Sequence, residues 1–120
     1  MFAEKAAKDR VRVFVEKAFA AYEDDRDLFA YLIVREHSEF VKHAQRYAHP
    51  GQVVIKLIEE GQKAGEIKIG DPFLLGSWLV GAVIRVCIVR FYGDLKNKLP
   101  DYSAETAQAV WAMLQKPAHG

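Results

Sequence analysis

The chain has 120 residues, 51% of them hydrophobic, and its 17 basic and 16 acidic residues leave a formal net charge of +1. This length and composition fit one ordered globular domain over residues 1–120 and exclude a disordered chain. The balanced charge, with no basic stripe, argues against a sequence-independent grip on nucleic acid.

Two helices are predicted in the first half of the chain. The first runs from near Phe2 to Tyr22, because apolar residues recur there at three- and four-residue steps, namely Val11, Phe14, Val15, Ala18, Phe19 and Tyr22. The second covers about Arg26 to Tyr47 and is capped by Asp24 or Asp25. It ends before Pro50, because a proline disfavours helix at the preceding residue.

A third helix is predicted from about Pro50 to Ala64. It leads into residues 61–67, which have the pattern Gly-x-x-x-Gly-Glu-Ile. Gly65 suits a left-handed cap at the end of this helix. Asp71 then caps a fourth helix, and Pro72 takes its first position.

The fourth helix, Pro72 to about Tyr92, is apolar nearly all round, so it must be covered on more than one side. Its length resembles a membrane span, but Arg85 and Arg90 favour a buried helix without membrane contact. About five helices do not suffice to cover it, which indicates self-association. Ser103 caps the last helix, and Pro117 ends it. The apolar seam of that helix is narrow and consists of Ala107, Val110, Trp111 and Leu114.

Nothing in the chain indicates catalysis or a cofactor. The single cysteine, Cys87, stands between Val86 and Ile88 with no base at local spacing, so we interpret it as a small buried hydrophobe. The chain opens without a secretion signal. We therefore expect a cytoplasmic protein that is not an enzyme.

The glycine-rich junction and the Asp-Pro start of a long apolar helix resemble the C-terminal half of tetracycline-repressor-type (TetR family) regulators. The resemblance implies an all-α domain that holds a small, largely apolar effector and dimerises through its last two long helices as a four-helix bundle. Since no helix-turn-helix reading head is found, we expect this chain alone not to bind an operator. The residues that carry the resemblance are Gly61, Gly65, Glu66, Ile67, Asp71, Pro72 and Gly81. The residues assigned to the dimer interface are Gly76, Val80, Val83, Cys87, Val110, Trp111 and Leu114.

Five residues are candidates for contact with the effector, each with a structural alternative. Arg85 faces an anionic group on the effector, or it pairs with an acidic side chain or helix-end carbonyls. Trp78 borders a notch made by small residues, which admits either a ligand or a neighbouring helix. His37 is a ligand contact or a hydrogen-bonded core residue. Phe14 and Tyr31 line a pocket or the core, because pocket walls are themselves mostly apolar.

Two other classes of protein stay open. One is a helical homodimeric interaction protein without a ligand. The other is a small helical metal-binding protein, in which Glu36, His37, Glu39 and His43 lie close together along one helix. Their spacing matches none of the tight zinc motifs, so no metal is assigned.

Overall fold

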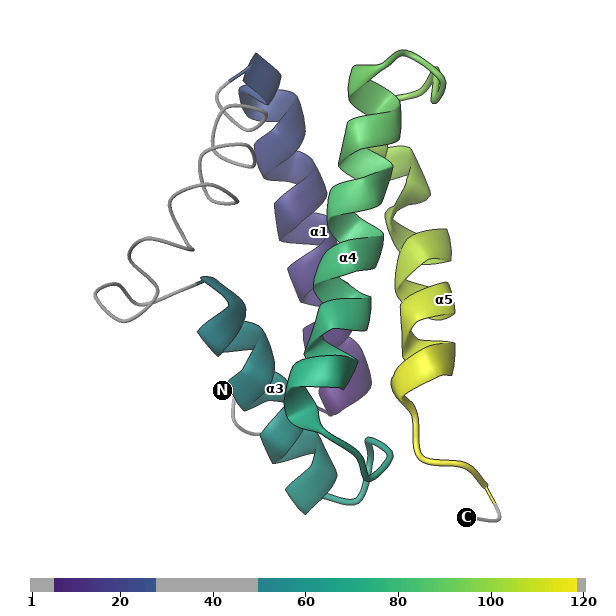
Figure 1. Cartoon of the computed structure of the whole chain (residues 1–120). Coiled ribbons are helices and arrows are strands. Elements are labelled where there is room, and N and C mark those ends of the chain that lie inside the picture. The colour runs from purple at the N-terminus through teal and green to yellow at the C-terminus, as the bar shows by residue number, and fades with distance from the viewer. Residues whose placement is uncertain (1–5, 28–49, 119–120) are drawn as a thin grey trace, which may run out of the picture.

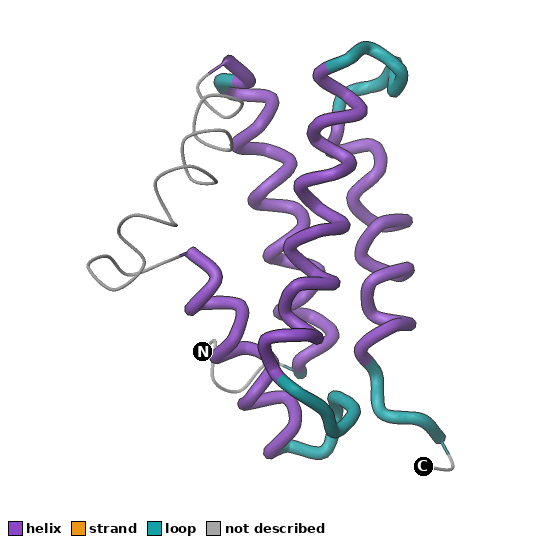
Figure 2. Tube along the Cα trace, in the orientation of Figure 1, coloured by secondary structure: helices purple, strands orange, loops and turns teal. Residues whose placement is uncertain are grey.

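The computed structural model describes residues 6–27 and 50–118. Within them the chain forms the helices α1 (Ala7–Asp24), α3 (Pro50–Lys63), α4 (Pro72–Phe91) and α5 (Ser103–Leu114), with a short 3-10 turn, η2 (Leu99–Tyr102), before α5. The all-α class is therefore confirmed. In Figure 1, α1, α4 and α5 run side by side along the molecule, while α3 packs against the lower part of α4. Figure 2 shows loops only at the two ends of this arrangement, apart from the undescribed segments.

The first helix follows the predicted spacing. Val11, Val15, Phe19 and Tyr22 recur at steps of three or four residues and are buried, because residues at these spacings share one face of a helix. Phe14 and Ala18 are half-buried beside them. The helix ends at Asp24, two residues later than predicted. Of the second predicted helix, Arg26 and Asp27 are helical, and the remainder lies outside the described residues.

Gly65 ends α3 as predicted. Its φ of 76° lies in the left-handed region, where glycine has no steric penalty. The Gly65 amide donates to the Gln62 carbonyl at 3.1 Å, and the Glu66 amide donates to the Gly61 carbonyl at 2.9 Å. This pair of bonds is a Schellman motif, and it satisfies carbonyls that the helix end leaves open.

The residues after Gly65 tie three helices together. The Glu66 carboxylate accepts a hydrogen bond from the Ala7 amide at 3.3 Å, at the start of α1. Ile67 is buried, and it forms an isolated antiparallel bridge with Gln115 beyond the end of α5. The Lys68 amide donates to the Leu114 carbonyl at 2.9 Å. The junction thus fixes the same end of α1, α3 and α5.

Gly61 makes room for this arrangement. A Cβ added at Gly61 would lie 2.7 Å from Ile67 Cγ1, closer still to its Cδ1, and 3.2 Å from the Ala7 Cβ. A larger residue would therefore displace the buried Ile67 side chain.

Both ends of α4 are capped, and the cap at its start is the predicted one. Asp71 Oδ1 accepts from the Phe73 amide at 2.9 Å, and Pro72 takes the first helical position. At the other end, Gly93 adopts a φ of 89°, and the Asp94 amide reaches back to the Val89 carbonyl at 3.2 Å. This second Schellman motif stops the helix.

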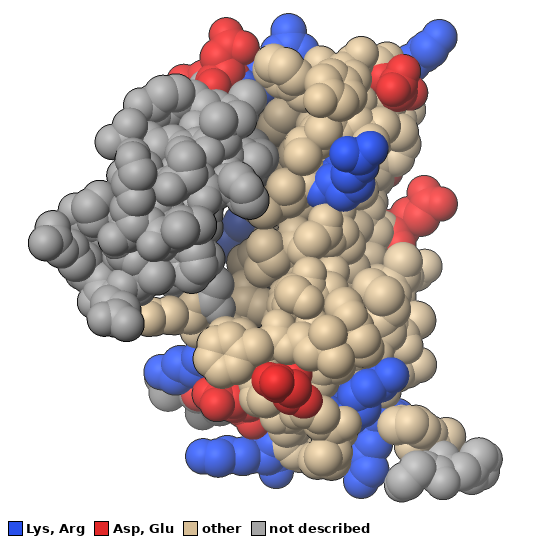
Figure 3. Space-filling model, in the orientation of Figure 1, with Lys and Arg blue, Asp and Glu red and all other residues tan. Residues whose placement is uncertain are grey.

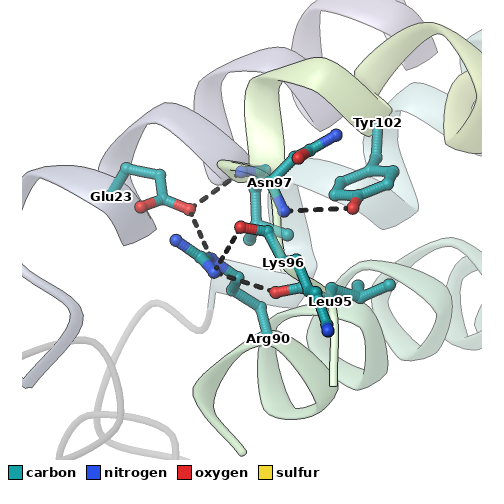
Figure 4. A network of polar contacts seen from close by, with 7 residues as sticks. Glu23, Arg90, Leu95, Lys96, Asn97 and Tyr102 are labelled. Carbon is teal, nitrogen blue, oxygen red and sulfur yellow. Dashed lines mark hydrogen bonds and ion pairs between the residues drawn. The ribbon is translucent and has the colours of Figure 1, made fainter. Parts of the chain in front are cut away.

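A polar network joins the far end of α4 to α1 and to the loop before η2 (Figure 4). Arg90 Nε donates to Glu23 Oε2 at 3.2 Å, and the Leu99 amide donates to the same oxygen at 2.8 Å. Arg90 Nη1 donates to the Leu95 carbonyl at 2.8 Å and to the Lys96 carbonyl at 3.3 Å. The ionic side chains are only 16% and 15% exposed, so this pair is screened by water less than a surface pair.

The start of α5 differs from the prediction. Ser103 is the first residue of the helix and is buried, and no side chain caps the helix start. The preceding turn η2, whose Pro100 cannot donate a backbone hydrogen bond, leads the chain directly into α5.

Candidate functional site

The outward face of α4 is the most unusual surface of the described residues. We use this name for the side chains opposite the buried row of α4, at Phe73, Leu74, Ser77, Gly81, Ile84, Arg85, Ile88 and Phe91, with Tyr92 just beyond the helix. Phe73 is 70% exposed, Leu74 53%, Phe91 48% and Tyr92 71%. Figure 3 shows a broad uncharged surface over α4 and α5, with charged side chains gathered mainly at its two ends. Contiguous exposed apolar surface of this kind marks interaction sites.

The buried row of α4 explains why the opposite face of the helix is exposed to solvent. Leu75, Leu79, Val83 and Cys87 recur every fourth residue and are at most 3% exposed. They pack on the cluster built from α1, α3 and α5. Because the other side of the helix is equally apolar, the sequence alone does not indicate which side faces inward.

Five of the seven residues assigned to a dimer interface face the interior of their own chain. They are Gly76, Val83, Cys87, Val110 and Leu114, whereas Val80 and Trp111 are half-buried against the core. Gly76 sits where α4 approaches α3, since an added Cβ would lie 3.1 Å from Ile55 Cδ1. The assignment of those five is corrected for this reason, because their side chains are buried within their own chain.

Arg85 was predicted to face an anionic group on an effector or to pair with an acidic side chain or helix-end carbonyls. Its side chain is exposed at the edge of the outward face of α4. Of the charged residues in α4, which is described from end to end, Arg85 alone is exposed, because Arg90 is held by Glu23. No local pattern predicts the Arg90–Glu23 pair, because its members are 67 residues apart.

The other ligand candidates are only partly placed. Phe14 and Trp78 are half-buried against the core, and Lys68 Nζ lies 5.7 Å from the centroid of the Trp78 ring, within cation–π range. Gly81 is exposed and Ala82 half-buried, so small residues do lie between Trp78 and Arg85. Tyr31 and His37 lie outside the described residues, as do Glu36, Glu39 and His43.

One cavity of about 390 Å³ is lined by described residues at the junction. Its walls come from the start of α1 and the end of α3, where Arg10 Nη1 pairs with Glu60 Oε1 at 2.8 Å. Of the predicted ligand residues that the structure describes, namely Phe14, Trp78 and Arg85, none lines it. Within residues 6–27 and 50–118 no three His, Cys, Asp or Glu side chains are grouped to hold a metal ion.

Burial controls the chemistry of Cys87. Loss of solvent raises the pKa of the Cys87 thiol to about 12, and the nearby Glu23 carboxylate acts in the same direction. A thiol that stays protonated is a poor nucleophile. This agrees with the interpretation of Cys87 as a small buried hydrophobe.

Among the described residues, one helix is long and apolar enough to cross a membrane by length and composition alone. It is α4, and 28% of its most apolar window is buried inside the molecule.

Comparisons with known proteins found no match: no family model, no curated protein and no solved structure is similar to this chain.

Proposed function

We propose that this chain is a homodimerisation module in which α4 and α5 of two copies pack as a four-helix bundle. The observation that carries the proposal is the outward face of α4, where large apolar side chains stay exposed beside the described residues 6–27 and 50–118. Exposing such side chains to water is unfavourable, at about 25 cal/mol per Å² of apolar surface. A second copy offers the same face, and interfaces of permanent dimers resemble a domain core cut in half.

The wider role that we propose is the effector-binding half of a TetR-like regulator. Its support is the resemblance of the junction and of the Asp-Pro helix start to that family. A largely apolar effector would be held among the first four helices, where Phe14 and Trp78 are the half-buried candidates among the described residues. By binding one arrangement of the dimer better than another, the effector would shift the dimer toward that arrangement and change the spacing of attached reading heads.

The mass of the particle in solution tests the dimer. We expect light scattering after size exclusion to give twice the chain mass of 13.6 kDa at micromolar concentration. Leu74→Glu should give the single-chain mass, because it places a charge in the interface. Leu74 is the third residue of α4, a position where glutamate favours the helix start, so the fold should survive.

The matched control is Ile69→Glu. Ile69 is 85% exposed and precedes α4, so this variant adds the same charge outside the proposed interface and should stay dimeric. A single-chain mass for the unaltered protein, or flotation of single chains with phospholipid vesicles, would contradict the proposal.

The proposal that the chain binds an effector is tested separately, by thermal unfolding of the dimer. An effector that binds only the folded protein should raise the unfolding temperature in a saturable manner. A library of small apolar and amphipathic molecules is the probe. If none of them shifts the unfolding temperature of a confirmed dimer, the chain is better described as a dimerisation module without an effector.

A further inference from the structure

We infer that the residues after α5 act as a releasable strap, which holds the start of α1 in place through Glu66. The name C-terminal strap is used for Gln115, Lys116 and Pro117. Withdrawal of the strap would loosen the start of α1 while the core stays folded. The strap and α1 belong to the same chain, so this coupling does not depend on the proposed homodimer.

The C-terminal strap runs antiparallel to the linker between α3 and α4, at the end of the molecule where α1 begins (Figure 1). Two main-chain hydrogen bonds join the linker to the end of α5 and to the strap. The Lys68 amide donates to the Leu114 carbonyl at 2.9 Å, and the Lys116 amide donates to the Glu66 carbonyl at 3.0 Å. The second of these bonds is donated by the strap itself, so the strap is attached to Glu66.

The strap is held less firmly than the residues beside it. Gln115, Lys116 and Pro117 are all exposed, whereas Ile67 and Leu114 are at most 1% exposed. A segment with few buried apolar contacts and solvent-exposed backbone bonds opens locally, at a small part of the free energy that global unfolding requires. The strap can therefore leave while Ile67 and Leu114 stay buried.

Glu66 carries the effect of the strap to α1. Its backbone carbonyl accepts from the Lys116 amide, and its side-chain Oε1 accepts from the Ala7 amide at 3.3 Å. The N-cap residue of α1 is Ala6, which makes no side-chain cap, so Glu66 supplies the acceptor from 59 residues away. A carboxylate is also favourable at a helix start because of the helix dipole. Loss of the strap frees the backbone of Glu66, and its side chain then holds the Ala7 amide less well.

The same residue links the strap to the cavity at the junction. Ala7, Gly61 and Glu66 all line this cavity of about 390 Å³. A partner that withdraws the strap would therefore change the cavity and the start of α1 without contacting either. Because coupling between two sites is reciprocal, a molecule bound in the cavity would in turn change how firmly the strap is held.

Hydrogen exchange of single backbone amides, followed by NMR, tests this coupling. Lys116→Pro removes the amide that the strap donates to Glu66. Residue 116 precedes Pro117 and is therefore biased toward extended backbone, which proline also adopts. Lys116→Ala is the matched control, because alanine removes the side chain and keeps the amide.

We expect Lys116→Pro to speed exchange of the Ala7 amide about fivefold, the effect of losing about one hydrogen bond. Lys116→Ala should leave that rate unchanged. The Asp94 amide, in the exposed turn at the other end of α4, should exchange equally fast in all three proteins. An unchanged Ala7 rate in Lys116→Pro, or the same acceleration in Lys116→Ala, would overturn the strap. If Lys116→Pro fails to fold, a chain ending at Gln115 lacks the same amide, with a chain ending at Pro117 as its control.

A double-mutant cycle tests whether Glu66 is the link. Glu66→Ala should speed exchange of the Ala7 amide, and adding Lys116→Pro should then have no further effect on it. Glu66→Gln keeps an acceptor oxygen and should preserve the coupling. Exchange of the Lys116 amide should also be faster in Glu66→Ala, as reciprocal coupling requires. A further acceleration in the double variant would show that the effect bypasses Glu66 and would overturn its role. A single-chain mass for the unaltered protein would overturn the homodimer alone.

Discussion

The junction between α3 and α4 and the outward face of α4 are neighbours in the chain, yet their side chains have opposite surroundings. At the junction, Gly61 makes space for Ile67, and Glu66 accepts a hydrogen bond from the start of α1. On the outward face of α4, Phe73 and Leu74 are more than half exposed. A residue whose contacts lie within its own chain is explained by folding. A large apolar residue without such contacts indicates a partner.

This difference changes how strongly the motifs of the junction support a particular function. The Gly-x-x-x-Gly-Glu-Ile pattern and the Asp71-Pro72 start each have a local structural purpose, as a helix end, a buried bridge and a helix cap. They would be useful in any helical protein with this junction. The proposed function therefore depends more on the outward face of α4 than on the motifs that carry the TetR resemblance.

The largest expected effect compares two leucines of the same helix. Leu79 is fully buried, and Leu79→Ala should lower the free energy of unfolding by about 2–5 kcal/mol through lost burial and a cavity. Leu74→Ala should cost less than about 1 kcal/mol in the single chain, because this side chain is already half exposed. Urea unfolding at high dilution measures both, since dimer formation adds stability at higher concentration. Equal losses would remove the distinction between the two faces of α4.

Two glycines sharpen the same comparison. Gly61→Ala should destabilise the fold by about 1–3 kcal/mol, because the new methyl group overlaps Ile67. Gly81→Ala should instead stabilise the single chain by up to about 1 kcal/mol, because alanine favours helix and the site is open. Circular dichroism during thermal unfolding measures the two changes. A stabilising Gly61→Ala would show that the junction is less tightly packed than described.

The Arg90–Glu23 pair shows whether the other end of α4 is also fixed by contacts within the chain. Glu23→Gln should lower the free energy of unfolding by about 1–3 kcal/mol, because it removes a charged acceptor shared by Arg90 and the Leu99 amide. Glu16→Gln is the control, since Glu16 pairs with Arg12 on the surface and should change stability by less than about 1 kcal/mol. Chemical unfolding of both variants gives the comparison. Similar small losses would mean that the partly buried network contributes little.

The smallest expected effect concerns Cys87. Because burial raises the pKa of the folded thiol to about 12, from an ordinary value of 9.0, the unfolded chain loses this proton at lower pH than the folded one. The contribution of Cys87 to stability is therefore complete below pH 9 and declines as the pH rises toward 12. Cys87→Ala should flatten the alkaline part of the stability profile. A disulfide reagent near neutral pH should label native Cys87 far more slowly than the unfolded chain, and rapid native labelling would contradict its burial.

Much of the fold follows from local sequence rules. The buried row from Val11 to Tyr22, the left-handed Gly65 and the Asp71-Pro72 start were predicted, because each depends on spacing or on backbone chemistry within a few residues. Ser103 was assigned wrongly as a cap, because the sequence did not reveal the 3-10 turn that leads directly into α5.

The candidate site was harder to predict. A helix that is apolar all round carries no periodic signal for its inward side, so Val83 and Cys87 were assigned to a dimer interface although their own chain buries them. The ion pair of Arg90 with Glu23 depends on the packing of α4 against α1. The residues next to Arg90 and those next to Glu23 do not indicate this packing. Tertiary packing determines both which side of α4 faces inward and which residue pairs with Arg90.

Side-chain footprinting with hydroxyl radicals tests the central claim most directly, because it reports the exposure of individual residues of the unaltered chain. The reaction is run at a concentration where the dimer predominates and again after dilution below its dissociation constant. We predict that Phe73, Leu74 and Phe91 are protected in the concentrated sample and become reactive on dilution, while Val53 and Ile69 react equally in both. Unchanged reactivity of Phe73, Leu74 and Phe91, or protection of Val53 and Ile69 instead, would contradict the assignment of the outward face of α4 as the contact between two copies.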